Sequence, residues 1–238
     1  MWYLYWQYYL MGIILIPGII IAAIAQSKIS SAYRAFSGVL SKKGLTGAQA
    51  AQKILDGANI TTTKIQAIPG ELTDNYNPKT DVVSLSKGVH DSTSVAAIGI
   101  AAHEVGHTIQ HHTNYVPVKI RGALVPVSNF MSQLLWPLLI IGIILNFTTL
   151  LGTAVMWAAI GIFGLSVLIQ LVTLPVEKNA SRRALKILES SDMLDEEELR
   201  GAKKVLDAAA LTYVAALLIS ILNFMRVFLA IAGSRKKK

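Results

Sequence analysis

Long stretches without a charged side chain constrain this chain more than any other feature of its sequence. Residues 1–27 and 122–176 carry no charge, and neither do residues 208–225, which precede Arg226 and further apolar residues. About 20 apolar residues in a helix cross the hydrocarbon core of a bilayer. Residues 122–176 are therefore long enough for two spans, with a turn near residues 146–149. The sequence predicts a mainly α membrane protein with about four transmembrane helices.

The first and last apolar stretches each predict one span. Residues 1–25 are interpreted as an uncleaved N-terminal membrane anchor, because they lack a basic start and are longer than the apolar part of a signal peptide. Residues 208–238 form a predicted C-terminal membrane helix with a basic tail. Arg226 interrupts this helix, so its side chain extends toward the tail, or the segment is tilted or only partly embedded. A full span is the favoured interpretation.

Two polar segments, residues 26–121 and 177–207, are separated by the predicted transmembrane hairpin of residues 122–176. A hairpin returns the chain to the side of the membrane that it left, so both polar segments are expected on one side. Positive charges cluster where these segments meet the spans, which predicts that this side is cytoplasmic. If the last segment crosses the membrane, the basic tail lies on the opposite side, which argues against this orientation. The flanking charges are Lys28, Arg34, Lys119, Arg121, Lys178, Arg182 and Arg183.

The net charge of +8 is attributed to these membrane flanks, and the expected partner is the lipid bilayer. A nucleic-acid surface usually shows a basic stripe with interleaved aromatic residues, and the sequence has none. Nucleic-acid binding is therefore not predicted.

The pentapeptide His103-Glu104-Val105-Gly106-His107 lies in an apolar stretch that is typical of a helix. Residues four apart share one helix face, so both imidazoles can reach one metal ion. Glu104 is near enough to hold a water molecule on that ion without being a ligand. The alternative is a helix whose histidines only cap or pack. Because the chain has no cysteine, a metal would be held by histidine and carboxylate, as in metal-assisted peptide hydrolysis.

A small sheet of about three strands is predicted before this helix. Residues 61–68 are rich in β-branched side chains, and the turn at Asn77-Pro78-Lys79-Thr80 joins two extended pieces into a hairpin. We expect Val82–Ser86 to be an exposed edge strand that holds a peptide substrate in extended form. The alternative, which the sequence supports equally well, is that the hairpin only covers the helix. Residues 26–121 are thus interpreted as a small α+β, zincin-like catalytic segment with a short sheet and an HExxH helix.

A hydrolytic zinc site needs a third protein ligand, and the residues alone leave several candidates. His111 lies one turn beyond His107 on the same helix face, and His90 precedes the helix as a cap or a substrate-side group. Among the acids, Glu177 stands at the predicted start of a helix after Pro175. Ala180 follows it three residues later and allows another helix to pack closely.

Four segments carry a resemblance to a known family: AAHEVGHTIQHH, LPVEKNASRRALKIL, the LTDNYNP hairpin and LTYVA. Together they resemble the bacterial membrane neutral zinc metallopeptidases of the YugP-like type, over most of the chain. The E-x-x-A element is also similar to that of the more distant HtpX-like gluzincins. The resemblance implies a multi-pass protein of the bacterial cell membrane that cleaves peptide or membrane-protein substrates, alone, as an oligomer or with partner membrane proteins. It implies zinc (Zn2+) held by His103, His107 and Glu177, with Glu104 as the general base.

The chain departs from the family pattern at three positions. Asn179 stands where the resemblance leads us to expect an acid, and Asn75 and Asn77 stand where relatives tend to have histidine and aspartate. These differences affect the support of the zinc ligands or the specificity, and leave the ligand set intact.

Three further side chains have two interpretations each. Tyr213 in LTYVA packs with a satisfied hydroxyl, or donates a hydrogen bond to the developing oxyanion. Arg182 and Arg183 are membrane-flank charges, or orient Glu177 or a substrate carbonyl.

Two other classes of protein compete with the protease hypothesis. A catalytically silent zinc-binding membrane protein, chaperone-like or regulatory, would have no need for Glu104. A transporter or scaffold would be expected to hold polar residues in its spans, and residues 122–176 contain almost none.

Overall fold

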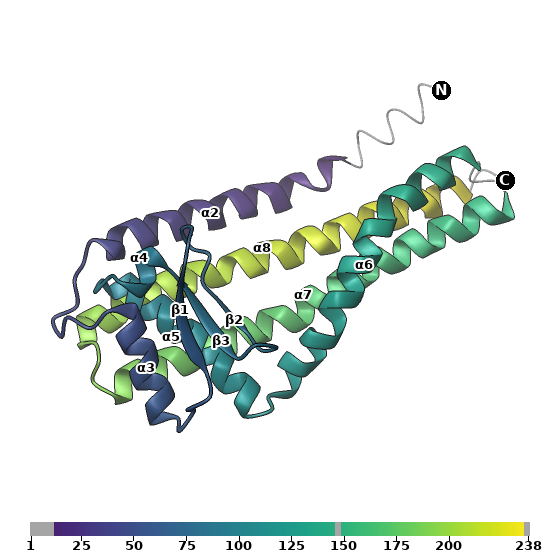
Figure 1. Cartoon of the computed structure of the whole chain (residues 1–238). Coiled ribbons are helices and arrows are strands. Elements are labelled where there is room, and N and C mark those ends of the chain that lie inside the picture. Colours follow the sequence, from purple (N-terminus) through teal and green to yellow (C-terminus); the bar gives the residue numbers. More distant parts are fainter. Residues whose placement is uncertain (1–11, 146–148, 236–238) are drawn as a thin grey trace. The chain divides into compact units, whose positions relative to one another are not determined.

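The computed structural model describes residues 12–145 and 149–235, and these residues form two compact units. Unit 1 comprises the described parts of residues 1–24, 120–174 and 213–238, and unit 2 comprises residues 25–119 and 175–212. Figure 1 labels the elements along the chain. They are α2 (Ile16–Ser37), α3 (Gly47–Gly57), β1 (Lys64–Ile68), β2 (Asn75–Asn77), β3 (Val82–Ser86), α4 (Lys87–His90), α5 (Val95–His112), α6 (Val116–Ile144), α7 (Leu150–Ser190) and α8 (Glu196–Arg235).

Unit 1 is built from helical segments in which few of the described apolar side chains are buried. In the described part of the chain, α7 and residues Glu196–Leu229 of α8 are long and apolar enough to cross a membrane. These two helices correspond to the predicted third and fourth spans. The spans expected within residues 1–25 and 122–145 stay predictions, and residues 1–11 and 146–148 lie outside the described residues.

Helix α7 corrects the prediction that a new helix starts after Pro175. The helix is continuous from Leu150 to Ser190 with Pro175 inside it, so Glu177 lies mid-helix. A proline within a helix removes one backbone N–H donor and one hydrogen bond, and neighbouring helices can absorb that loss. The segment that carries Glu177 therefore continues directly from an apolar span.

The sheet of unit 2 has the strand order β1-β3-β2. Strand β2 pairs antiparallel with β3, which confirms the hairpin, and β1 pairs parallel with the other side of β3. The prediction that Val82–Ser86 is an edge strand is wrong, because both of its edges are occupied. Its sequence explains the position: four of its five residues are buried, whereas β1 and β2 are mostly exposed. A strand buried on both faces is typical of a sheet centre.

Helix α5 runs through the core of unit 2. The Ser94 side chain caps its first turn by accepting a hydrogen bond from the Ala97 N–H. Most of the helix is buried, because it packs against α3, the sheet and the portions of α7 and α8 that belong to unit 2 (Figure 1). This burial fixes the helix on nearly every side, so the residues on its remaining face are held in place.

Local signals fix the ends of two neighbouring helices. Thr46 and Gln49 form the capping box at the start of α3, as their spacing predicts. At the start of α8, Asp195 and Glu198 exchange hydrogen bonds between side chain and backbone N–H in the same way. Asp195 and Glu198 of the acidic run therefore cap the start of α8.

Candidate metal centre

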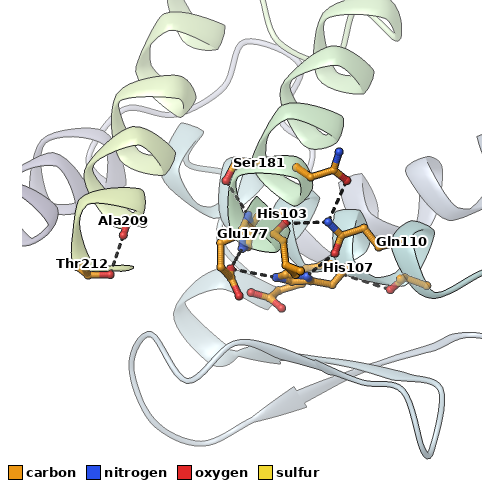
Figure 2. A network of polar contacts seen from close by, with 11 residues as sticks. His103, His107, Gln110, Glu177, Ser181, Ala209 and Thr212 are labelled. Carbon is orange, nitrogen blue, oxygen red and sulfur yellow. Dashed lines mark hydrogen bonds and ion pairs between the residues drawn. The ribbon is translucent and has the colours of Figure 1, made fainter. Parts of the chain in front are cut away.

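Three predicted ligands from two helices meet in unit 2. His103 and His107 lie one turn apart on α5, and both turn their Nε2 atoms toward Glu177 on α7 (Figure 2). The Oε2 atom of Glu177 is 3.3 Å from His103 Nε2 and 3.2 Å from His107 Nε2. One ligand atom from each residue lies within 4.8 Å of the others. Glu177 is 3% exposed and the two histidine side chains are 14% and 15% exposed, so the three groups converge in a nearly closed site.

A close approach of the two helices brings these ligands together. Gly106 of α5 faces the backbone of Ala180 on α7, and a Cβ atom on Gly106 would lie 2.6 Å from the Ala180 carbonyl oxygen. Ala180 itself is fully buried. Small residues on both sides allow the backbones to approach, as the Ala180 position predicted. Gly106 of the HEVGH motif therefore permits the close approach of α5 and α7 that brings His107 near Glu177.

The second nitrogen of each histidine is held by a polar side chain. His103 Nδ1 is 3.0 Å from Ser181 Oγ, and His107 Nδ1 is 3.0 Å from Gln110 Oε1. These contacts leave both Nε2 atoms directed toward Glu177. Partners of this kind orient histidine ligands in metal sites.

The electrostatics of the site suit a metal and a base. Burial raises the pKa of Glu104, the neighbouring His103 and His107 oppose that rise, and the net direction is upward. Burial alone would lower the pKa of His107, but its hydrogen bond with the Glu177 carboxylate raises it overall. The imidazoles of His103 and His107 thus favour the charged form of Glu104, whereas burial favours its neutral form and outweighs them.

The donor set fits zinc. Two imidazole nitrogens and one carboxylate oxygen are the ligands of many hydrolytic zinc sites, which keep one position open for water. His103, His107 and Glu177 would hold the ion.

The structure separates other candidate residues from this group. His111 Nδ1 contacts the Tyr76 hydroxyl at 3.2 Å, and His90 pairs with its neighbour Asp91. Neither histidine belongs to the three-residue group around Glu177. Tyr213 belongs to unit 1 rather than to the unit that holds this centre, so its oxyanion role stays a prediction.

Each residue that departs from the family pattern makes a side-chain hydrogen bond. Asn75 donates to the Thr73 carbonyl, and Asn77 accepts from the Lys79 N–H, so both shape the hairpin. Asn179 Oδ1 accepts from Gln110 and from Arg183.

Sequence reasoning missed Gln110 and Ser181. Their spacing offers a signal: Gln110 lies three residues after His107, and Ser181 four residues after Glu177, so each shares a helix face with a ligand.

An HExxH helix whose histidines converge with a glutamate from a second helix is an arrangement found in zinc-dependent hydrolases. The family described as "Putative neutral zinc metallopeptidase" matches residues 11–232 of this chain, and the chain belongs to that family. The protein named "Putative membrane protease YugP" from Bacillus subtilis (strain 168) is 39% identical over 211 residues, which cover 89% of this chain and 92% of the relative. The YugP-like resemblance is thereby confirmed. No solved structure matches the chain.

Proposed function

We propose that this protein is a membrane-embedded zinc-dependent metalloendopeptidase. The observation that carries the proposal is the convergence of His103, His107 and Glu177 beside the buried Glu104, in a chain of a zinc metallopeptidase family. Glu104 is informative because it is outside the ligand group, so a purely structural metal site would have no use for it.

The chemistry divides between the metal and the protein. Zinc, when bound, supplies Lewis acidity that polarises a water molecule and the scissile carbonyl. Glu104 takes a proton from the attacking water and delivers it to the leaving amine. Burial raises the pKa of Glu104, which strengthens it as a base. Tyr213 is the proposed donor to the developing oxyanion.

A peptide substrate would bind in extended form along a free strand edge. Strand β3 is covered on both sides, so this role passes to an outer strand. We favour β2, because Tyr76 of β2 contacts His111 at the end of the metal-binding helix. The strand is short, which suits brief capture of unfolded or exposed segments of peptide and membrane-protein substrates.

The protein is proposed to be a multi-pass protein of the bacterial cell membrane with the centre on the cytoplasmic side. Apolar helices α7 and α8 and the membrane protease relative support the membrane location. The flanking positive charges support the orientation.

The test compares wild-type protein with Glu104→Gln, both purified in detergent. Glutamine keeps the size of the side chain and removes the base. We expect both proteins to contain zinc, with cleavage of casein lost from the variant by about 100-fold or more. Equal cleavage by both would disprove the base assignment. Zinc in both with cleavage by neither would favour a catalytically silent zinc-binding protein.

A further inference from the structure

Gln110 is a fully buried amide one turn after His107 on α5. A buried amide needs partners for its two N–H donors and for its oxygen, since unmet hydrogen bonds are costly away from water. Figure 2 shows its side chain between the two helices of the metal centre. Each of its polar atoms has a partner there.

Its partners fix the orientation of this amide. Gln110 Nε2 is 2.8 Å from the backbone carbonyl oxygen of Val176 and 3.0 Å from Asn179 Oδ1. A backbone carbonyl oxygen only accepts hydrogen bonds, so the Gln110 nitrogen must face Val176. The Gln110 oxygen must then face His107.

That orientation determines the tautomer of His107. Gln110 Oε1 lies 3.0 Å from His107 Nδ1, and an amide oxygen can only accept. His107 therefore carries a proton on Nδ1. In the neutral ring that a metal needs, the lone pair is then on Nε2, the nitrogen that lies 3.2 Å from Glu177. A metal requires this lone pair.

Asn179 extends the same logic on α7. Its Oδ1 atom is 2.9 Å from Arg183 Nε, and an arginine only donates, so oxygen must occupy this position. The Arg183 guanidinium in turn lies 5.9 Å from the centre of the Tyr115 ring. The chain of hydrogen bonds from His107 through Gln110 to Asn179 thus ends at the positively charged guanidinium of Arg183.

We propose that Gln110 is a positioning residue that fixes the tautomer of His107 and holds that ligand beside the helix carrying Glu177. The proposal rests on the zinc site of the proposed function. Gln110 is suited to the task because it bonds one ligand directly and the backbone of Val176, the residue before another ligand. One side chain therefore spans both helices and sets part of the ligand geometry before a metal arrives. The asparagine at 179 supplies the acceptor that keeps Gln110 in this orientation.

The test measures zinc affinity of the full-length protein in detergent by chelator competition, together with the visible spectrum of the Co2+ form. Gln110→Ala removes the support, and Gln110→Glu keeps the size but turns an acceptor toward the acceptors of Val176 and Asn179. Both variants are expected to bind zinc about 10- to 100-fold more weakly and to shift the Co2+ spectrum. Asn179→Asp retains an acceptor oxygen, so it should lose less affinity than Asn179→Ala.

Thr108→Val is the matched control. Thr108 is also fully buried on α5, and its hydroxyl bonds the Glu104 carbonyl of its own helix. Thr108→Val tests whether the loss of any buried polar group on this helix weakens zinc binding. We expect the variant to bind zinc with wild-type affinity. Wild-type affinity and spectrum in both Gln110 variants would overturn the positioning role alone. A wild-type protein that binds no zinc would overturn the proposed function, and this inference with it.

Discussion

Replacing Gly106 by alanine tests whether the spacing of α5 and α7 controls the metal centre. The added Cβ would lie 2.6 Å from the Ala180 carbonyl oxygen, whereas ordinary contacts begin near 3.4 Å. The two backbones must therefore separate by about 0.8 Å at this point, the difference between those two distances. A helical carbonyl cannot rotate away, so the movement falls on the helices.

This separation acts directly on the ligands, because His107 is the next residue along α5. Its Nε2 atom is 3.2 Å from Glu177 Oε2, and metal–ligand distances tolerate about 0.2 Å. We expect zinc affinity to fall at least about tenfold and turnover about 100-fold. Overpacking costs about 1–3 kcal/mol of folding free energy, and alanine returns up to about 1 kcal/mol through its helix propensity. The metal centre should therefore suffer more than the fold.

Gly99→Ala is the control, because it makes the same change on the same helix. Its Cβ would lie 3.2 Å from the Ala202 side chain, away from the ligand helix α7. Zinc content, chelator competition and thermal unfolding are measured for both variants. Gly99→Ala should keep zinc affinity within about twofold of wild type. Wild-type zinc affinity in Gly106→Ala would refute the argument that close helix packing positions the ligands.

The remaining predictions concern the third metal ligand and the stability of the fold at acidic pH. Glu177→Ala should lose zinc by elemental analysis, while His111→Ala should keep it, and the reverse pattern would make His111 the ligand. Burial alone would raise the pKa of Asp81, but hydrogen bonds led by those from Thr62 and Thr63 lower it to about 2. Since this pKa lies below the ordinary value of 3.8, the stabilisation from Asp81 is present above about pH 4 and disappears as the pH falls toward about 2. Asp81→Asn should therefore flatten the pH dependence of thermal unfolding in that range, and an unchanged slope would contradict the role of these bonds.

The sequence was sufficient for features that depend on local spacing. The i, i+4 histidines, the capping box of Thr46 and Gln49 and the β2–β3 hairpin follow from helix and turn geometry, and the structure contains each of them. The convergence of Glu177 with the histidines was anticipated through family resemblance. Distances along the sequence alone would have left His111 as an alternative.

Features that depend on distant partners were mispredicted or missed. The position of β3 in the sheet depends on β1 pairing in parallel with it, and a long-range pairing leaves little trace in local sequence. The prediction treated Pro175 as a helix breaker, but α7 continues through it. In the sequence, Gln110 resembles an ordinary polar residue near a helix end. Only the structure shows that its side chain donates a hydrogen bond to the backbone of α7.

X-ray absorption at the zinc edge of purified wild-type protein tests the central claim most directly, because it reports the ligands around the metal. The account predicts one zinc per chain, with two imidazole nitrogens at about 2.0–2.1 Å and carboxylate or water oxygens at about 2.0–2.2 Å. The imidazole signal should fall by half in His103→Ala protein that has been loaded with excess zinc. A first shell with three imidazoles, or protein without zinc, would contradict a centre made by His103, His107 and Glu177.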